Sequence, residues 1–195
     1  MTRLLLIGGS LRRDSLNTRL LQHLAQRLEP RCAVELLLPS DVMLPLFDQD
    51  LESDPAVMDC VATLHRHISD HDGFIVASPE YNGQITAYLK NLVDWVSRVA
   101  YVRDGFAPPF CDRPVLLCSA STGRSGGSVA IPHARALFGY VGALVLGDTV
   151  CVPFADQAWD PQEGFLFGDA FEQRINQATD RLIALAGAAH LLELT

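Results

Sequence analysis

The sequence predicts an α/β fold with a doubly wound, five-stranded parallel sheet and helices on both faces. Continuous apolar runs alternate with helical patterns along the whole chain, and these runs show no regular polar alternation. Unbroken apolar strands are typical of parallel sheets that helices cover on both sides. In addition, polar loops follow three of the runs directly, as expected where parallel strands end at a binding edge.

The elements follow from local patterns. The candidate strands cover 4–7, 33–38, 74–77, 115–118 and 143–150. The candidate helices run from Leu16 to just before Pro30, over 54–69 with Pro55 in the first turn, over 85–99, over 129–138 and from about 168 to 186. Asp14 or Ser15 is the expected N-cap of the first helix. The irregular stretches 39–53, 104–114 and 153–164 are candidate lid or interface loops.

Composition limits the function classes. The 195 residues suit a single domain over 1–195, and 49% hydrophobic residues suffice for a sizeable core. A net charge of −8 without a basic tail disfavours nucleic acid or an anionic membrane as a partner. The apolar run over 4–7 is too short for a signal peptide, and no stretch is long enough to span a membrane, so we expect a cytoplasmic protein.

The cysteines favour the same compartment. There are five, with no C-x-x-C pair, which fits scattered reduced thiols better than a disulfide framework. Cys118 lies within an apolar run, so an inert buried thiol is expected there rather than a nucleophile.

The first loop, residues 8–17, joins an apolar run to an amphipathic helix. This arrangement presents unpaired backbone N–H groups to an anion. Ser10, Ser15 and Asn17 add hydroxyl or amide donors, and Arg12 adds a guanidinium. The loop is therefore predicted to hold a phosphate, although it matches neither G-x-G-x-x-G nor a P-loop. The alternative is an ordinary capped helix start with solvated arginines.

The second loop turns sharply at Pro79 and again at Asn82-Gly83, where positive φ is favoured. Such a turn aims backbone groups at one edge of a planar ring. Tyr81 would pack beside that ring, and Glu80 is an acid at the mouth. The alternative is a plain strand-to-helix turn with a surface tyrosine.

The third loop, residues 119–127, is rich in serine and glycine and precedes a helix. Its N–H groups would stabilise negative charge on a bound ring, and Arg124 would meet a second anion. The alternative is a flexible linker. Because all three loops follow parallel strands, we expect them to converge at one edge of the sheet, which favours a binding site.

Together these motifs resemble the NADPH-dependent FMN reductase family, a flavodoxin-like group that includes chromate, quinone and azo-dye reductases. The similarity extends from the first strand through the last helix. The pattern G-S-x-R-x-x-S-x-N-x-x-L is matched by Gly9, Ser10, Arg12, Ser15, Asn17 and Leu20. The pattern P-E-Y-N-G followed by L-K-N-x-x-D-W is matched by 79–83 and by Leu89, Lys90, Asn91, Asp94 and Trp95. The third-loop glycine turn corresponds to Ser121, Thr122, Gly123, Gly126 and Gly127. The chain departs from the family at Thr86-Ala87, where many members have Pro-Gly.

The resemblance implies an FMN site. The first loop would hold the phosphate, the second would line the isoalloxazine, and 121–123 would contact its pyrimidine edge. The expected cofactor-binding residues are Ser10, Arg12, Ser15, Leu16, Asn17, Pro79, Glu80, Tyr81, Asn82, Gly83, Ser121, Thr122 and Gly123. The resemblance also implies a homodimer or homotetramer, with the helix over 85–99 between subunits and Trp95 near the contact.

The predicted function is an FMN-dependent NAD(P)H oxidoreductase. Hydride would pass from NAD(P)H to bound FMN and then to a quinone, azo, metal-oxyanion or flavin acceptor, so no catalytic side chain is expected. The alternatives are a flavodoxin-type electron carrier, whose usual T-x-T-G-x-T turn is absent, and an FMN-binding module without turnover. No residue here chooses between NADPH and NADH.

Two further groups are not assigned a function. His65, His67 and His71 have no acidic or cysteine partner at a ligand spacing, so we interpret them as solvated histidines at a helix end rather than metal ligands. Ser125 and His133 lack the G-x-S-x-G elbow of a hydrolase.

Overall fold

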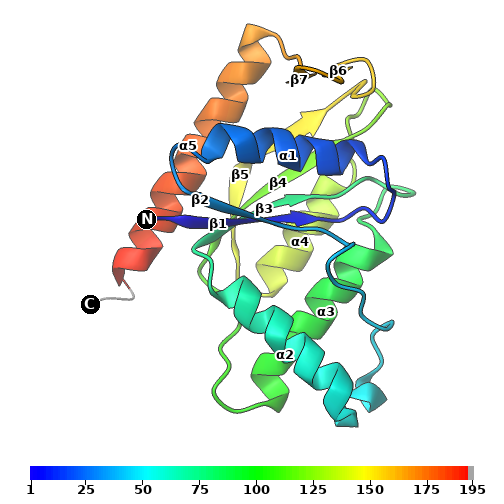
Figure 1. Cartoon of the computed structure of the whole chain (residues 1–195), viewed down its shortest axis with the longest axis vertical. Helices are drawn as coiled ribbons and strands as arrows, with labels where there is room; N and C mark the ends of the chain where they lie inside the picture. The colour runs from blue at the N-terminus through cyan, green and yellow to red at the C-terminus, as the bar shows by residue number, and fades with distance from the viewer. Residues whose placement is uncertain (193–195) are drawn as a thin grey trace.

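The sheet is parallel, as predicted. The computed structural model describes residues 1–192 (Figure 1). Five strands pair in the order β2-β1-β3-β4-β5. They are β1 (Arg3–Gly8), β2 (Ala33–Leu37), β3 (Gly73–Ala77), β4 (Pro114–Ala120) and β5 (Leu144–Val152). The strand order reverses between β1 and β3, and such a switch point opens a crevice at the carboxyl ends of the strands.

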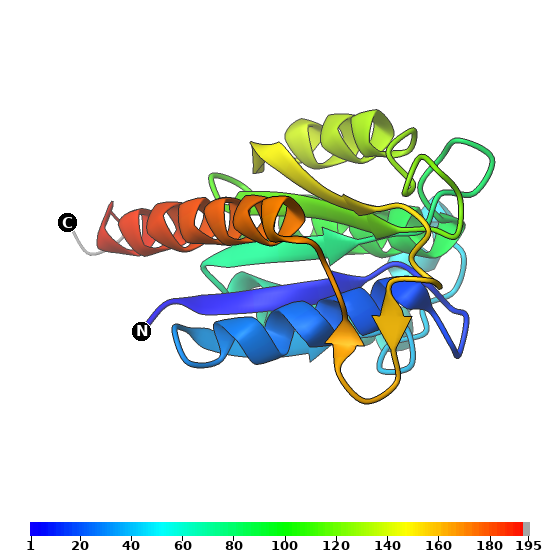
Figure 2. The same ribbon diagram turned by 90° about the horizontal axis from the view of Figure 1, so that it is seen from above.

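Helices cover both faces of the sheet (Figures 1 and 2). On one face lie α1 (Leu16–Leu28) and α5 (Asp169–Leu192). On the other lie α2 (Pro55–Ser69), α3 (Ala87–Val102) and α4 (Ile131–Tyr140). Four were predicted to within three residues at each end, whereas α5 continues six residues beyond its predicted end at 186. The central strands bury nearly every side chain between these layers, whereas the edge strand β2 is partly exposed. Within residues 1–192 no helix is long and apolar enough to cross a membrane.

The helix starts follow local capping chemistry. Ser15, not Asp14, caps α1, and its Oγ accepts a hydrogen bond from the Thr18 N–H. Asp54 caps α2 with Pro55 in the first turn. Thr86, where many family members have proline, caps α3: its hydroxyl accepts from the Leu89 N–H, and the helix starts at Ala87.

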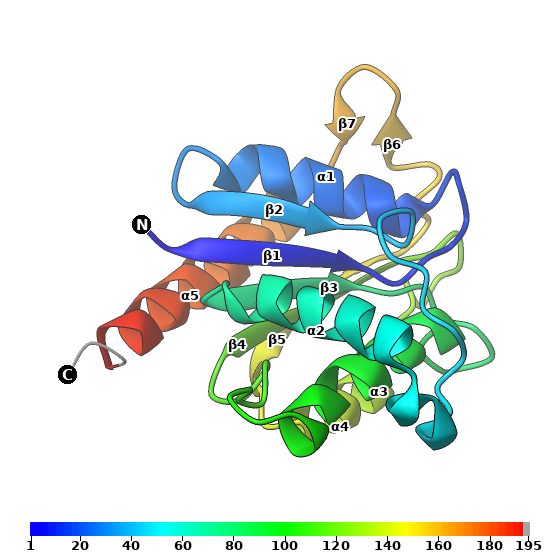
Figure 3. The ribbon, with the colours of Figure 1, turned by 60° about the horizontal axis from the view of Figure 1, so that its bottom comes forward.

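Two short elements lie inside stretches that were expected to be irregular. They are a 3-10 turn, η1 (Gln49–Ser53), and a hairpin formed by β6 (Trp159–Asp160) and β7 (Gly164–Phe165). The hairpin stands beside α1 (Figure 3). Ring contacts hold it there: Trp159 and Phe165 pack edge to face, and the Arg19 guanidinium lies 5.0 Å from the Trp159 ring centroid.

Asn91 and Trp95, at the end of the second family pattern, bond other parts of the same chain. The Asn91 side chain accepts from the Phe47 N–H at 2.7 Å and donates to the Pro45 carbonyl at 2.9 Å. The Trp95 indole N–H donates to the same carbonyl at 2.8 Å, and the ring is fully buried against Phe47. The indole is enclosed within the chain and would not itself contact another subunit, while a subunit contact near Trp95 stays a prediction.

Two histidines, one in α2 and one just after it, also differ from the expectation of solvated side chains. His65 and His71 are buried, and one ring nitrogen of each bonds a carbonyl: Nε2 of His65 that of Ala107 at 2.8 Å, and Nδ1 of His71 that of His67 at 2.9 Å. Burial lowers the pKa of both imidazoles. The spacing of these residues could not reveal their burial, because α2 packs beside a loop that lies about forty residues away in sequence.

Candidate functional site

The three loops converge at the carboxyl edge of the sheet, as predicted (Figure 2). Here the first loop is taken as 8–17, the second as 78–86 and the third as 119–130. They follow β1, β3 and β4, which are neighbours in the sheet. Three side chains tie the loops together: Asn17, Thr86 and Glu80.

Asn17 joins the first loop to the third. Its Nδ2 donates to the Ala120 carbonyl and its Oδ1 accepts from the Ala120 N–H, both at 2.9 Å. The side chain is buried, and its partner is 103 residues away in sequence. Asn17 was predicted to hold phosphate with its side chain, but the structure gives the amide a different partner. Its backbone N–H remains free for an anion.

The first loop presents a set of free donors. Among residues 1–192, the backbone N–H groups of Ser10, Leu11, Leu16 and Asn17 have no protein acceptor. Leu16 and Asn17 form the first turn of α1, where the helix dipole favours negative charge. Buried Ser10 carries a hydroxyl that accepts from the Arg12 N–H at 3.3 Å and keeps its own proton for a ligand. This combination is suited to a phosphate group.

The second loop is a tight turn. Tyr81 and Gln84 exchange both backbone hydrogen bonds, with φ of 53° at Asn82 and 75° at Gly83. The turn leaves the Tyr81 side chain about half exposed. The Glu80 side chain has a partner within the chain: its Oε2 accepts a hydrogen bond from the Val129 N–H at 3.1 Å, which links the second loop to the third.

The third loop is held by hydrogen bonds within itself and to β5 and the segment after it, unlike a flexible linker. The Ser121 N–H donates to the Val152 carbonyl, and the Gly123 N–H donates to Ser121 Oγ. Between them, the Thr122 N–H has no protein acceptor within the described chain. Of the predicted trio 121–123, Thr122 is thus the residue whose amide is available to a ligand.

Close packing explains one glycine of the third loop. Gly127 has a φ of 81°, and a Cβ built there would lie 2.0 Å from Ser119 Oγ. No other residue fits without moving β4. Ser119 is also the single buried side-chain polar group without a partner among the described residues.

The first and third loops carry exposed positive charge, although the net charge of the protein is −8. The guanidinium groups of Arg12, Arg13 and Arg124 are exposed, and none forms a hydrogen bond or ion pair within residues 1–192. Most other arginines are engaged, as in the Arg98–Glu52 and Arg27–Glu172 pairs. Unpaired cations therefore gather on the first and third loops, where an anionic ligand would bind.

Comparison with known proteins identifies the family. The model of the NADPH-dependent FMN reductase family matches residues 2–157. The chain belongs to this family. A quinone reductase of Escherichia coli is 31% identical over 138 residues, which are 71% of this chain and 70% of that protein. An NAD(P)H-dependent FMN reductase of Pseudomonas aeruginosa is 31% identical over 90% of each chain.

A solved structure supports the flavodoxin-like fold. The flavoenzyme NAD(P)H:(acceptor) oxidoreductase FerB of Paracoccus denitrificans superposes with a TM-score of 0.80 at 22% identity, over 97% of this chain and 99% of that one. The predicted family, fold and enzyme class are thus confirmed: the protein is an FMN-dependent NAD(P)H oxidoreductase.

The donor set fits the cofactor of this family. FMN carries a dianionic phosphate and a ring whose pyrimidine edge becomes electron-rich on reduction. The first loop carries free N–H groups, a hydroxyl and the Arg12 guanidinium, which are donors suited to a phosphate, and the third carries the free Thr122 N–H, a donor suited to the edge of such a ring. Cys118 is not part of this set: its thiol is buried, as predicted, and burial raises its pKa, which disfavours the reactive thiolate.

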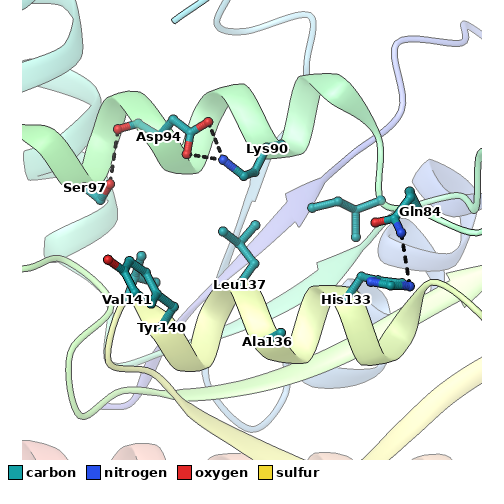
Figure 4. A pocket seen from close by; sticks show the side chains of 10 residues that line it. Gln84, Lys90, Asp94, Ser97, His133, Ala136, Leu137, Tyr140 and Val141 are labelled. Carbon is teal, nitrogen blue, oxygen red and sulfur yellow. Dashed lines mark hydrogen bonds and ion pairs between the residues drawn. The ribbon is translucent and has the colours of Figure 1, made fainter. Parts of the chain in front are cut away.

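A further cavity lies between α3 and α4, and Gln84 and Ile85 of the second loop line one end of it (Figure 4). It measures about 430 Å³, and the ion pair Lys90–Asp94 borders it. At the end near the second loop, the Gln84 amide bonds His133 at 3.1 Å. At the other end stands Tyr140, which is 91% exposed.

Sequence reasoning missed the residues that connect the loops. Thr86 was noted only as a departure from the family, and the contact from Glu80 to Val129 was not foreseen. A usable signal was the hydroxyl of Thr86 just before a helical pattern, which is typical of an N-cap. No local signal indicated that this hydroxyl also reaches Gly9, 77 residues away.

Proposed function

We propose that the three loops form the FMN site with the roles expected from the sequence. The phosphate binds the first loop, through the Arg12 guanidinium, the hydroxyls of Ser10 and Ser15 and the backbone N–H groups of Leu16 and Asn17. The ring lies against 79–83, and its pyrimidine edge faces 121–123. The observation that carries this proposal is the set of unpaired N–H groups at the start of α1, beside an unpaired Arg12.

When bound, FMN supplies the redox chemistry: it accepts hydride from the nicotinamide and then passes two electrons to an acceptor. The chain's own contribution is positioning and electrostatics. The Thr122 N–H donates to the pyrimidine edge and favours the negative charge that develops there. Tyr81 shields one side of the ring. Both substrates use the same open face in turn, so ping-pong kinetics are expected.

A quinone is the acceptor class that we favour. The named relatives include quinone reductases and a 2-hydroxy-1,4-benzoquinone reductase of Burkholderia, at 31–32% identity. A planar quinone stacks on a flat ring and needs no dedicated pocket of its own. Azo compounds, metal oxyanions and free flavins remain the comparison substrates.

We also propose that the protein is a cytoplasmic homodimer or homotetramer that acts as one domain over 1–195. The α3–α4 face supports this, because the cavity there lies beside an almost fully exposed Tyr140. When a protruding side chain and a cavity share one face, two copies of that face can pair across a two-fold axis, each side chain entering the other copy's cavity. Light scattering at micromolar concentration tests the assembly, and Tyr140→Glu should shift it toward monomer.

The decisive experiment combines binding with turnover. Apoprotein is titrated with FMN, and NADPH or NADH oxidation is then followed with and without benzoquinone. Tight FMN binding and a quinone-stimulated rate are expected. A protein that binds FMN but oxidises neither nicotinamide would instead be a carrier or binding module.

A further inference from the structure

We infer that Thr86 is a positioning residue for the flavin phosphate, although it lies in the second loop and not in the phosphate loop. This inference rests on the proposed function. The Thr86 Oγ1 donates to the Gly9 carbonyl at 2.6 Å and accepts from the Leu89 N–H at 3.2 Å. One buried hydroxyl thus caps α3 and fixes the peptide that precedes Ser10.

The geometry of that peptide carries the argument. A trans peptide points its C=O and the following N–H in opposite directions. With the Gly9 carbonyl held on Thr86, the Ser10 N–H must point away from α3. Because α3 and α1 cover opposite faces of the sheet, this N–H faces the side where α1 begins. Thr86 therefore aims a phosphate donor.

Other contacts leave the peptide little freedom to turn in another way. The Gly9 N–H donates to the Ala77 carbonyl at 2.8 Å, and Ser78 lies against Gly9 so closely that a Cβ there would be 3.0 Å from the serine. The Ser10 N–H itself has no protein acceptor among the described residues. Without the Thr86 hydroxyl, the buried Gly9 carbonyl loses its partner, and rotating the peptide to recover one would turn the Ser10 N–H away.

The test compares FMN with riboflavin, which has the same ring but no phosphate. Dissociation constants for both are measured from flavin fluorescence on apoprotein. Thr86→Val removes the hydroxyl at nearly constant shape and should weaken FMN binding about tenfold while changing riboflavin binding less than about twofold. Thr86→Ser should keep wild-type values. Thr179→Val, at a buried threonine of α5, is the matched control and should affect neither ligand.

A second hydroxyl-free variant guards against misfolding. Thr86→Ala also removes the hydroxyl but keeps the backbone N–H that donates to Ser78 Oγ at 3.4 Å, so it should show the same loss for FMN. Equal weakening of both ligands, or no change in either variant, would overturn the role of Thr86. Failure of the proposed function looks different: wild-type protein would then bind FMN no more tightly than riboflavin.

Discussion

At the scale of single residues, Arg12 and Arg13 are neighbours with different expected roles. Both guanidinium groups are exposed and unpaired within residues 1–192, but only Arg12 lies at the charged position of the phosphate pattern. Arg12→Ala should weaken FMN binding about ten- to hundredfold, because a charge-assisted hydrogen bond is lost. Titration of the apoprotein with FMN measures the dissociation constant of each variant. Arg13→Ala is the control, and equal losses in the two variants would contradict the assignment.

Asn17 stabilises the fold, although its position in the phosphate pattern suggests only a role in ligand binding. Asn17→Ala leaves the N–H and C=O of Ala120 unpaired in the interior, so we expect a loss of about 2–4 kcal/mol in the free energy of unfolding. Urea unfolding of the apoprotein measures this. Asn176→Ala removes an exposed amide that bonds Arg27 and should change stability far less. Similar midpoints for the two variants would argue against the link.

The same residues show how far sequence reasoning reaches. Residue types and order predict an anion site at the first loop, because they depend on local chemistry. The partner of each side chain depends on which strands become neighbours. Asn17 and Thr86 each bond backbone groups from another loop, at separations of 103 and 77 residues. No local pattern encodes such pairs.

At the scale of elements, the third loop depends on a backbone that only glycine allows. Gly127→Ala would place a Cβ against Ser119 at positive φ, so we expect a loss of at least about 2 kcal/mol in unfolding free energy and weaker FMN binding. Gly139→Ala, on the open surface of α4, should stabilise by about 0.5–1 kcal/mol. Thermal unfolding compares them, and equal melting points would refute the steric argument.

Element predictions succeed where a pattern repeats and fail where it does not. The five helices carry several apolar residues at helical spacing, and the five parallel strands are mostly apolar runs of four or more residues. The hairpin of β6 and β7 has two residues per strand, too few for any period, and is held by contacts of Trp159 and Phe165 with other parts of the chain. Its existence depends on α1 being in place, so the stretch 153–164 alone predicts a loop.

At the scale of the whole molecule, buried imidazoles make stability depend on pH. Burial lowers the pKa of His23, His65 and His71 in the folded state. The unfolded chain then binds more protons than the folded one below about pH 6.5. Stability should be fully present above that pH and decrease as the pH falls toward the lowered values. Melting temperatures between pH 8 and pH 5.5 measure this.

A variant identifies the source of the effect. His71→Gln removes one buried imidazole, so its melting temperature should vary less between pH 8 and pH 5.5 than that of wild type. A slope identical to wild type would exclude His71 as a contributor. Carboxylates titrate mostly below this range and add little to it.

The site is assembled from three segments that are distant in sequence, and this links flavin supply to protein lifetime. Residues 8–17, 78–86 and 119–130 meet only after β1, β3 and β4 have paired, so the unfolded chain has no such site. A ligand that binds only the folded form at a hundred times its dissociation constant adds about 2.7 kcal/mol of stability. In cells short of FMN, more of the protein would be unfolded and open to proteases, and its steady-state amount would fall. The abundance of this reductase should therefore follow the availability of its cofactor.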